Sequence, residues 1–222
     1  MSIVLKALLK INNMIAAQTK ETQSALNAKT AIQLLKEGNE RFVAKNMASR
    51  DLINQVQQTA TGQYPFATIL SCIDSRVSAE LVFDQGVGDI FSARVAGNIV
   101  NEDVLGSMEF ACKLAGTKVI VVLGHTACGA VKGACDGAEL GNLTALLNKI
   151  KPAVDAISEP SDASERNSKN LDFVNSVAEK NVTLTIDNIR KESPVLKEME
   201  DNGEIAIVGA MYDIIDGKVH WT

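Results

Sequence analysis

Two apolar runs constrain the fold most strongly, because each is followed at once by side chains that bind metals. Residues 66–70 (FATIL) precede Cys72, and residues 119–123 (VIVVL) precede His125 and Cys128. Apolar runs of this length predict buried β-strands. If these two strands lie side by side and parallel, their carboxyl ends bring the two thiols and the imidazole to one edge of the sheet, where ligands of open α/β proteins bind.

The ligand types favour zinc. Two sulfurs and one ring nitrogen suit this metal, and three protein ligands leave a fourth position open for water. Cys128 falls at the start of a helix predicted over 126–135, and that end of a helix favours a thiolate. Asp74 stands two residues after Cys72, so in an extended segment both side chains face the same way. The carboxylate can serve as a fourth ligand, or a bidentate pair with Arg76 can hold it off the metal.

Size and charge limit the classes of protein to which this sequence can belong. The 222 residues predict one domain with a sizeable core. A net charge of −5 without basic clusters argues against nucleic acid or an anionic membrane as a partner. No apolar run reaches the roughly 18–20 residues of a membrane-spanning helix. The four cysteines do not form the pattern of a disulfide framework, and Cys112 and Cys135 are expected to be buried free thiols in helices.

The amino-terminal segment, residues 1–29, allows two interpretations. Residues 1–18 have an amphipathic helix pattern, with an apolar face formed by Val4, Leu8, Ile11 and Ile15. The same residues also resemble an altered signal peptide that ends near Ala16-Ala17, although lysines and asparagines interrupt it. Residues 18–29 are polar and predict a linker or loose arm. Reduced thiols favour the cytoplasm, whereas a signal peptide would direct the chain to the periplasm.

Residues 30–222 alternate between strand and helix patterns and form one predicted domain. The predicted strands are 66–70, 89–95, 119–123, 204–212 and 218–221. The predicted helices are 30–45, 51–59, 78–83, 101–115, 126–135, 143–157, 171–191 and 193–202. We therefore expect an α/β fold: a mostly parallel central sheet of about four strands with an antiparallel edge strand, helices on both faces, and an extended amino-terminal helical arm.

The two metal-binding segments resemble those of the β-class carbonic anhydrase family in residue type, spacing and order. They read Cys72-Ile73-Asp74-Ser75-Arg76 and His125-Thr126-Ala127-Cys128-Gly129. The similarity continues through Gly62-Gln63, Phe91-Ser92-Ala93-Arg94, Ser107-Met108-Glu109-Phe110 and the carboxyl-terminal strand pair, and it covers most of the chain from about Thr30. It implies a zinc-dependent lyase, a carbonate dehydratase, in which zinc-bound hydroxide reversibly hydrates carbon dioxide to bicarbonate and a proton. The resemblance assigns the zinc ligands to Cys72, His125 and Cys128 and the carboxylate–arginine pair to Asp74 and Arg76.

The resemblance also implies a substrate pocket at a dimer interface, so we expect a homodimer or a homotetramer built as a dimer of dimers. Gln63 and Phe91 match the pocket positions. Phe110 stands where better-known members have tyrosine, which removes one hydroxyl contact, and Gly129 lets the backbone pass close to the metal. Ile69 replaces the tryptophan of the non-catalytic bicarbonate site found in some members, so no such site is expected.

Other functions stay open from the residues alone. The same fold could hydrolyse carbonyl sulfide or carbon disulfide, and Asp74 as a permanent fourth ligand would make a non-catalytic zinc protein. A thiol redox protein is disfavoured because neither segment is Cys-x-x-Cys. Arg94 is expected to be an ion partner at an interface rather than an anion site. Because two thiolates neutralise the zinc charge, activity is expected to rise with pH above neutrality.

Overall fold

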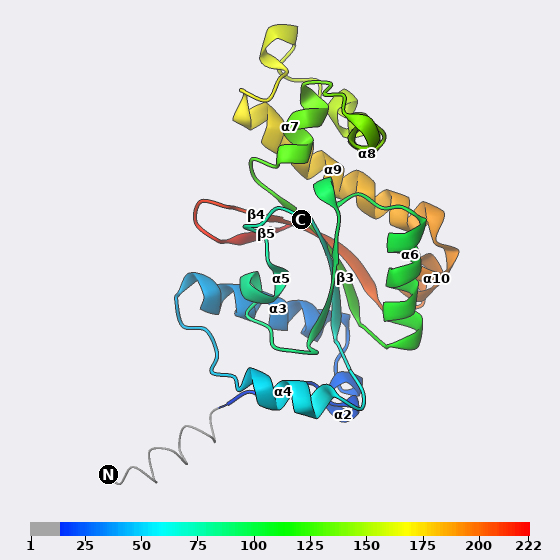
Figure 1. Cartoon of the computed structure of the whole chain (residues 1–222). Coiled ribbons are helices and arrows are strands. Elements are labelled where there is room, and N and C mark those ends of the chain that lie inside the picture. Colours follow the sequence, from blue (N-terminus) through cyan, green and yellow to red (C-terminus); the bar gives the residue numbers. More distant parts are fainter. Residues whose placement is uncertain (1–13) are drawn as a thin grey trace.

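The computed structural model describes residues 14–222, and this part of the chain forms a sheet of five strands in the order β2-β1-β3-β4-β5. The first four strands run parallel: β1 (Ala67–Ser71), β2 (Ile90–Arg94), β3 (Val119–His125) and β4 (Ala206–Tyr212). The last, β5 (Val219–Trp221), pairs with β4 in antiparallel orientation at one edge. The predicted α/β class, with its parallel sheet and antiparallel edge strand, is confirmed (Figure 1).

The two central strands explain the apolar runs of the sequence. Every residue of β1 and β3 is buried, as expected for parallel strands covered by helices on both faces. The register pairs Ala67 with Val119 and Ser71 with Leu123, so the two strands keep step toward their carboxyl ends. Cys72 therefore lies directly beyond β1, beside the end of β3.

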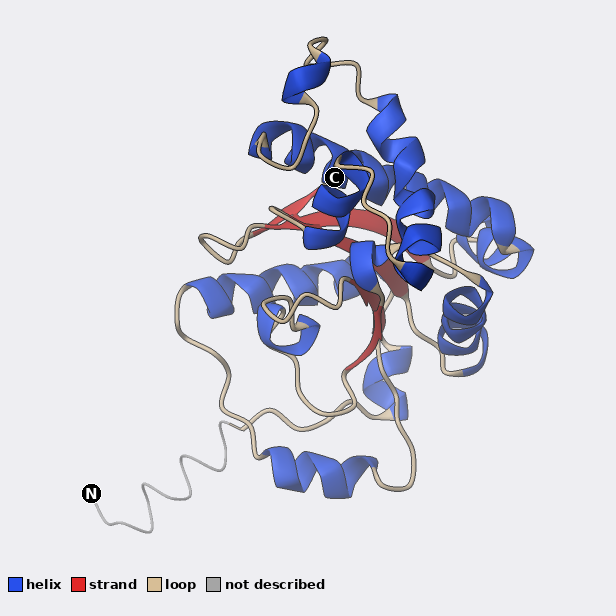
Figure 2. Ribbon diagram, turned by 45° about the horizontal axis from the view of Figure 1, so that its top comes forward, coloured by secondary structure: helices blue, strands red, loops and turns tan. Residues whose placement is uncertain are grey.

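Helices cover both faces of the sheet (Figure 2). One face packs against α3 (Ala28–Val43) and α5 (Ala79–Val82). The apolar core on the other face takes side chains from five helices: α6 (Glu102–Glu109), α7 (Gly129–Cys135), α8 (Gly141–Ala156), α9 (Leu171–Glu192) and α10 (Pro194–Asp201). The remaining short elements are α2 (Lys20–Ser24), α4 (Leu52–Thr59), η1 (Ala96–Asn98), η3 (Ala163–Glu165) and a π-helical turn, η2 (Phe110–Leu114), that continues α6. Among the residues described, no helix has the length and apolar character needed to span a bilayer.

The segment predicted as a polar linker, residues 18–29, is instead partly helical, and that prediction is wrong. Thr19 caps α2 and Asn27 caps α3, each in a capping box. Gln23 is buried, and its amide donates to the carbonyl oxygens of Pro65 (2.6 Å) and Ala115 (2.8 Å). The polar residues that suggest a linker are therefore the ones that cap these helices and satisfy buried carbonyl groups.

The helix predicted over residues 1–18 lies mostly outside the described residues, because residues 1–13 are not among them. Residues 14–18 are not helical. Instead, the backbone of Ile15 hydrogen-bonds with Ser49 (3.0 Å) and accepts from the Gln55 side chain (3.0 Å). Residues 14–18 are thus held by hydrogen bonds of their own backbone to Ser49 and to the Gln55 side chain of α4 rather than by an apolar helical face.

A buried ion cluster joins α3 and the connection from α3 to α4 to the loop between α5 and β2. The Asp84 side chain has no exposed surface, and it accepts hydrogen bonds from Arg41 (2.5 Å), Arg50 (2.5 Å) and the backbone N–H of Ala48 (3.0 Å). Burial alone would raise the pKa of this carboxyl group, but the hydrogen bonds outweigh it, and the pKa of Asp84 is lowered. The ionised carboxylate is therefore the form that the fold stabilises.

Candidate metal centre

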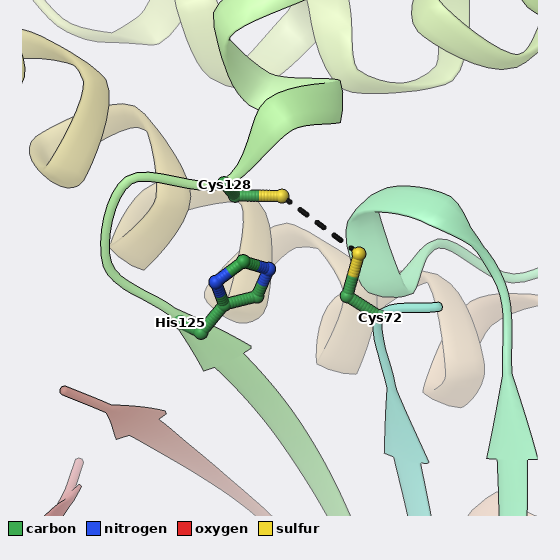
Figure 3. A group of neighbouring side chains, drawn as sticks. All are labelled: Cys72, His125 and Cys128. Atoms are coloured by element: carbon green, nitrogen blue, oxygen red, sulfur yellow. Dashed lines mark hydrogen bonds between the residues drawn. The ribbon is translucent and has the colours of Figure 1, made fainter. Parts of the chain in front are cut away.

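Three ligand side chains from distant parts of the chain converge beyond the carboxyl ends of β1 and β3 (Figure 3). Cys72 follows β1, His125 ends β3, and Cys128 immediately precedes α7. Their ligand atoms all lie within 4.8 Å of one another, and the two Sγ atoms are 3.9 Å apart. All three residues are buried. The structure thus brings together the three predicted ligands at the edge of the sheet where the sequence places them.

The hydrogen bonds of His125 leave one ring nitrogen free for a metal. Nδ1 lies 2.9 Å from the carbonyl oxygen of Thr126, and because a carbonyl only accepts, Nδ1 carries the proton. In the neutral ring Nε2 is then the acceptor, and it is buried without any hydrogen-bond partner. Burying such a lone pair unsatisfied is costly. A metal ion between Nε2 and the two sulfurs would satisfy it, and this donor set fits zinc.

The two buried thiols shift each other's pKa in opposite directions. The hydrogen bond from Cys128 lowers the pKa of Cys72 to about 4, and the same contact raises the pKa of Cys128 well above its ordinary value. Within the pair by itself these directions favour the thiolate at Cys72, and the thiolate at Cys128 stays a prediction for the metal-bound centre. A charge about 4 Å away contributes about 4 kcal/mol near a protein surface, whereas a helix terminus contributes about 0.3–1 kcal/mol. A dication bound between the two sulfurs would favour the thiolate form of both.

Asp74 and Arg76 form the pair that the sequence predicts. The Arg76 side chain donates from Nε to Oδ1 (2.9 Å) and from Nη2 to Oδ2 (2.7 Å), and its backbone N–H donates to Oδ1 (3.0 Å). These bonds keep the pKa of Asp74 far below its ordinary value. Oδ2 also lies 3.9 Å from His125 Nε2. The carboxylate is therefore beside the ligand group but is bound by the guanidinium.

Arg94 has a structural role that the sequence prediction missed. Its Nε donates to the carbonyl oxygen of Cys72 (3.1 Å), and its Nη2 donates to that of Asp74 (2.7 Å). Within this chain, the guanidinium fixes the segment between the ligand thiol and the carboxylate. The register that pairs Ser71 with Arg94 places it there, so a correct alignment of the two strands would have been the signal.

The predicted substrate residues are only partly near the ligands within one chain. Gly129 begins α7 next to Cys128. Gln63 precedes the amino end of β1, whereas Cys72 follows its carboxyl end. The rings of Phe91 and Phe110 have their centroids 6.2 Å apart, and both line a groove of about 650 Å³ along β2 and α6. The structure does not bring Gln63 or these two rings to the metal ligands of their own chain.

Comparisons with known proteins agree with this geometry. The family model described as carbonic anhydrase matches residues 67–219. Carbonic anhydrase 2 of Mycobacterium tuberculosis is 36% identical over 193 residues, covering 86% of this chain and 91% of that protein. A carbonic anhydrase of Mycolicibacterium smegmatis is 34% identical over 194 residues, covering 87% and 92%.

Solved structures give the class. The fold superposes on one of two tetrameric β-carbonic anhydrases from Sordaria macrospora with a TM-score of 0.63 at 26% identity, covering 75% of this chain and 88% of that one. It superposes on the β-carbonic anhydrase CcaA with a TM-score of 0.65 at 25% identity, covering 86% and 85%. With the family match, the relatives and the parallel sheet that carries two cysteines and a histidine at one edge, this chain belongs to the β-class carbonic anhydrase family.

Proposed function

We propose that this chain binds zinc through Cys72, His125 and Cys128 and uses it to interconvert carbon dioxide and bicarbonate. The observation that carries the proposal is the buried, unpartnered Nε2 of His125, which shares one small volume with two sulfurs. The names of the quoted relatives favour carbon dioxide over carbonyl sulfide or carbon disulfide as the substrate.

Asp74 and Arg76, beside the metal ligands, orient the reacting water. Zinc, when bound, acts as a Lewis acid that activates a water molecule at its open position. Asp74 stays ionised beside the ligand group and can accept a hydrogen bond from that water, which orients it toward the substrate. Arg76 holds both carboxylate oxygens and so keeps Asp74 from occupying the open position itself.

A second copy of the chain completes the substrate pocket in this proposal. Carbon dioxide is small and apolar, so it needs an apolar wall and few directed donors. Phe91 and Phe110 offer such a wall, and the amide of Gln63 is a suitable donor to a developing bicarbonate oxygen. All three lie away from the ligands of their own chain, and the structural relative from Sordaria macrospora is tetrameric. We therefore expect a homodimer or a dimer of dimers.

The free thiols support a reducing compartment. The structure holds Cys72, Cys112, Cys128 and Cys135 as free cysteines, so the cytoplasm is the proposed location. Cell fractionation with an antibody against the chain tests it, and recovery from the periplasm would favour the signal-peptide interpretation of residues 1–29.

The decisive experiment measures metal and activity on the same purified sample. We expect about one zinc per chain by mass spectrometry and hydration of carbon dioxide in a stopped-flow assay with a pH indicator. Zinc-loaded protein without hydration would instead identify a non-catalytic zinc protein. Faster turnover of carbonyl sulfide than of carbon dioxide would identify a hydrolase of that class.

A further inference from the structure

Helix α9 reaches the Cys72 side of the metal centre through Asn181. This residue is 3% exposed, and its Nδ2 donates to the carbonyl oxygen of Gly97 (2.8 Å). The N–H of the same Gly97 donates to the Sγ of Cys72 (3.4 Å). Gly97 has a φ of 71°, and a Cβ there would lie 2.5 Å from the Cδ1 of Ile150. Gly97 therefore lies between Ile150 of α8 and the sulfur of Cys72, and the Asn181 amide fixes the orientation of its backbone.

The same helix reaches the His125 and Cys128 side through Asn175. The Oδ1 of Asn175 accepts a hydrogen bond from the backbone N–H of Ala127 (2.8 Å). Ala127 lies between the two ligands and has a φ of 53°, a left-handed conformation that costs an alanine roughly 1–2 kcal/mol. An external acceptor for its N–H helps to hold the loop in this conformation, in which both ligand side chains point toward one site.

The two asparagines act from one rigid element. They are six residues apart, about 9 Å along the helix axis, and α9 contacts β3, α7 and η1. The apolar face that anchors the helix is fully buried and includes Val174, Val177, Val182 and Ile189. The Gly97 segment that donates to Cys72 and the loop between His125 and Cys128 are thus both tied to an element that cannot shift without disrupting the core.

We propose that Asn175 and Asn181 are positioning residues that set the distance between the ligands of the metal centre, with α9 as their common support. The proposal rests on the proposed zinc site. Asn181 works as a donor to Gly97, and Asn175 works as an acceptor from Ala127, because each faces a backbone group that allows only that role. The two residues should therefore respond differently to the same substitution.

The test replaces each asparagine by aspartate, which removes the NH₂ donor and keeps an acceptor oxygen. Asn181→Asp places a carboxylate against the Gly97 carbonyl oxygen, and we expect the affinity for Zn²⁺ and Co²⁺ to fall about tenfold or more. Asn175→Asp keeps its hydrogen bond, and we expect an affinity within about twofold of the parent, whereas Asn175→Leu should weaken binding about tenfold. Added negative charge alone would strengthen cation binding in both aspartate variants, so a loss at position 181 reports geometry.

The measurements are chelator competition for the metal affinity, the thiolate-to-Co²⁺ charge-transfer absorption for the ligand geometry, and urea unfolding for the fold. Asn188→Asp, the same change on an exposed position of α9, is the matched control and should leave the affinity and the spectrum unchanged. Equal affinities for Asn175→Asp and Asn181→Asp would overturn the proposal. So would a lower urea midpoint with an unaltered affinity and cobalt spectrum, which is the result of a merely structural role.

Two further outcomes are separate from the results that overturn the positioning role. If the parent protein binds neither metal, the proposed zinc site itself fails. If Asn181→Asp does not fold, the two variants of the half-buried Asn175 decide alone. Weak metal binding by Asn175→Leu with retained binding by Asn175→Asp supports the proposal, and equal binding by these two variants overturns it.

Discussion

Replacing Arg76 by alanine should separate metal binding from catalysis. The variant loses two hydrogen bonds to Asp74, of 2.9 and 2.7 Å, and keeps the one from the backbone N–H at 3.0 Å. The Arg76 side chain is 51% exposed, so the pair contributes only about 0.2–1 kcal/mol to folding. For a chain of this size, that lowers the melting temperature by at most about 4 °C.

The catalytic effect should be larger, because Asp74 Oδ2 is only 3.9 Å from His125 Nε2 and nothing else in the side-chain contacts of Asp74 restrains that oxygen. A released carboxylate can take the open position at the metal and exclude water. We expect kcat/KM for carbon dioxide hydration to fall about 10- to 100-fold, a loss of about 1.4–2.8 kcal/mol in transition-state stabilisation, with the zinc content unchanged. Stopped-flow hydration and metal analysis measure both quantities.

The matched control is Arg190→Ala, which removes a similar bidentate pair away from the metal. Arg190 donates to both carboxylate oxygens of Glu200, at 2.8 and 2.9 Å. We expect a comparable change in stability and no change in kcat/KM. An Arg76→Ala variant with full zinc and unaltered kcat/KM would refute the reasoning that this guanidinium keeps the carboxylate off the metal. Loss of zinc from that variant would also refute it, because Arg76 would then support metal binding itself.

Three further changes test other parts of the structure. Asp84→Asn removes a buried carboxylate whose folded pKa is lowered, so its stabilisation is present above the ordinary pKa of about 3.9 and is lost as the pH falls through the lowered value. Urea unfolding should show a loss of about 3–5 kcal/mol at neutral pH and a shallower fall in acid; an acid limb as steep as that of the parent would contradict this. Removing zinc with a chelator should abolish hydration of carbon dioxide, and adding Zn²⁺ back should restore it. The removal should also expose Cys72 and Cys128 to alkylation, which mass spectrometry can locate. Equal alkylation with and without metal would argue against ligation by these cysteines. Phe110→Glu places a charge on the groove beside β2, and sedimentation should show monomers that retain zinc but not activity, whereas an intact oligomer would remove Phe110 from the interface.

The parallel sheet and the ligand set were predictable because they depend on local pattern and strand direction. Both central strands are buried on both faces, so their sequences are continuous apolar runs with sharp ends. Cys72 and His125 each lie two residues beyond the end of their run. Parallel pairing then brings these residues to the same edge, whatever the details of the helices.

The supporting contacts were not predictable in the same way, because each joins ordinary surface-type residues across long stretches of chain. Arg94 contacts a carbonyl group 22 residues away, and Asn181 contacts one 84 residues away. Arginine and asparagine occur at many positions where they only meet solvent. The closeness of the two sulfurs, 3.9 Å apart, also depends on a contact between distant segments, so an argument from the helix terminus at Cys128 alone leaves it out.

Strand direction also explains why one chain holds the metal ligands but not the predicted substrate residues. Gln63 precedes β1, and Phe91 lies opposite Thr68, four residues before Cys72. The two ends of one strand cannot meet, so these side chains can approach a metal centre only from another copy of the chain. In the proposed dimer, a two-fold axis perpendicular to the strands would reverse their direction and set the amino-end residues of each copy beside the carboxyl-end ligands of the other, which would generate two equivalent sites. Metal affinity should then be a property of the single chain, set by contacts within it, while turnover should depend on protein concentration through the dissociation of the dimer.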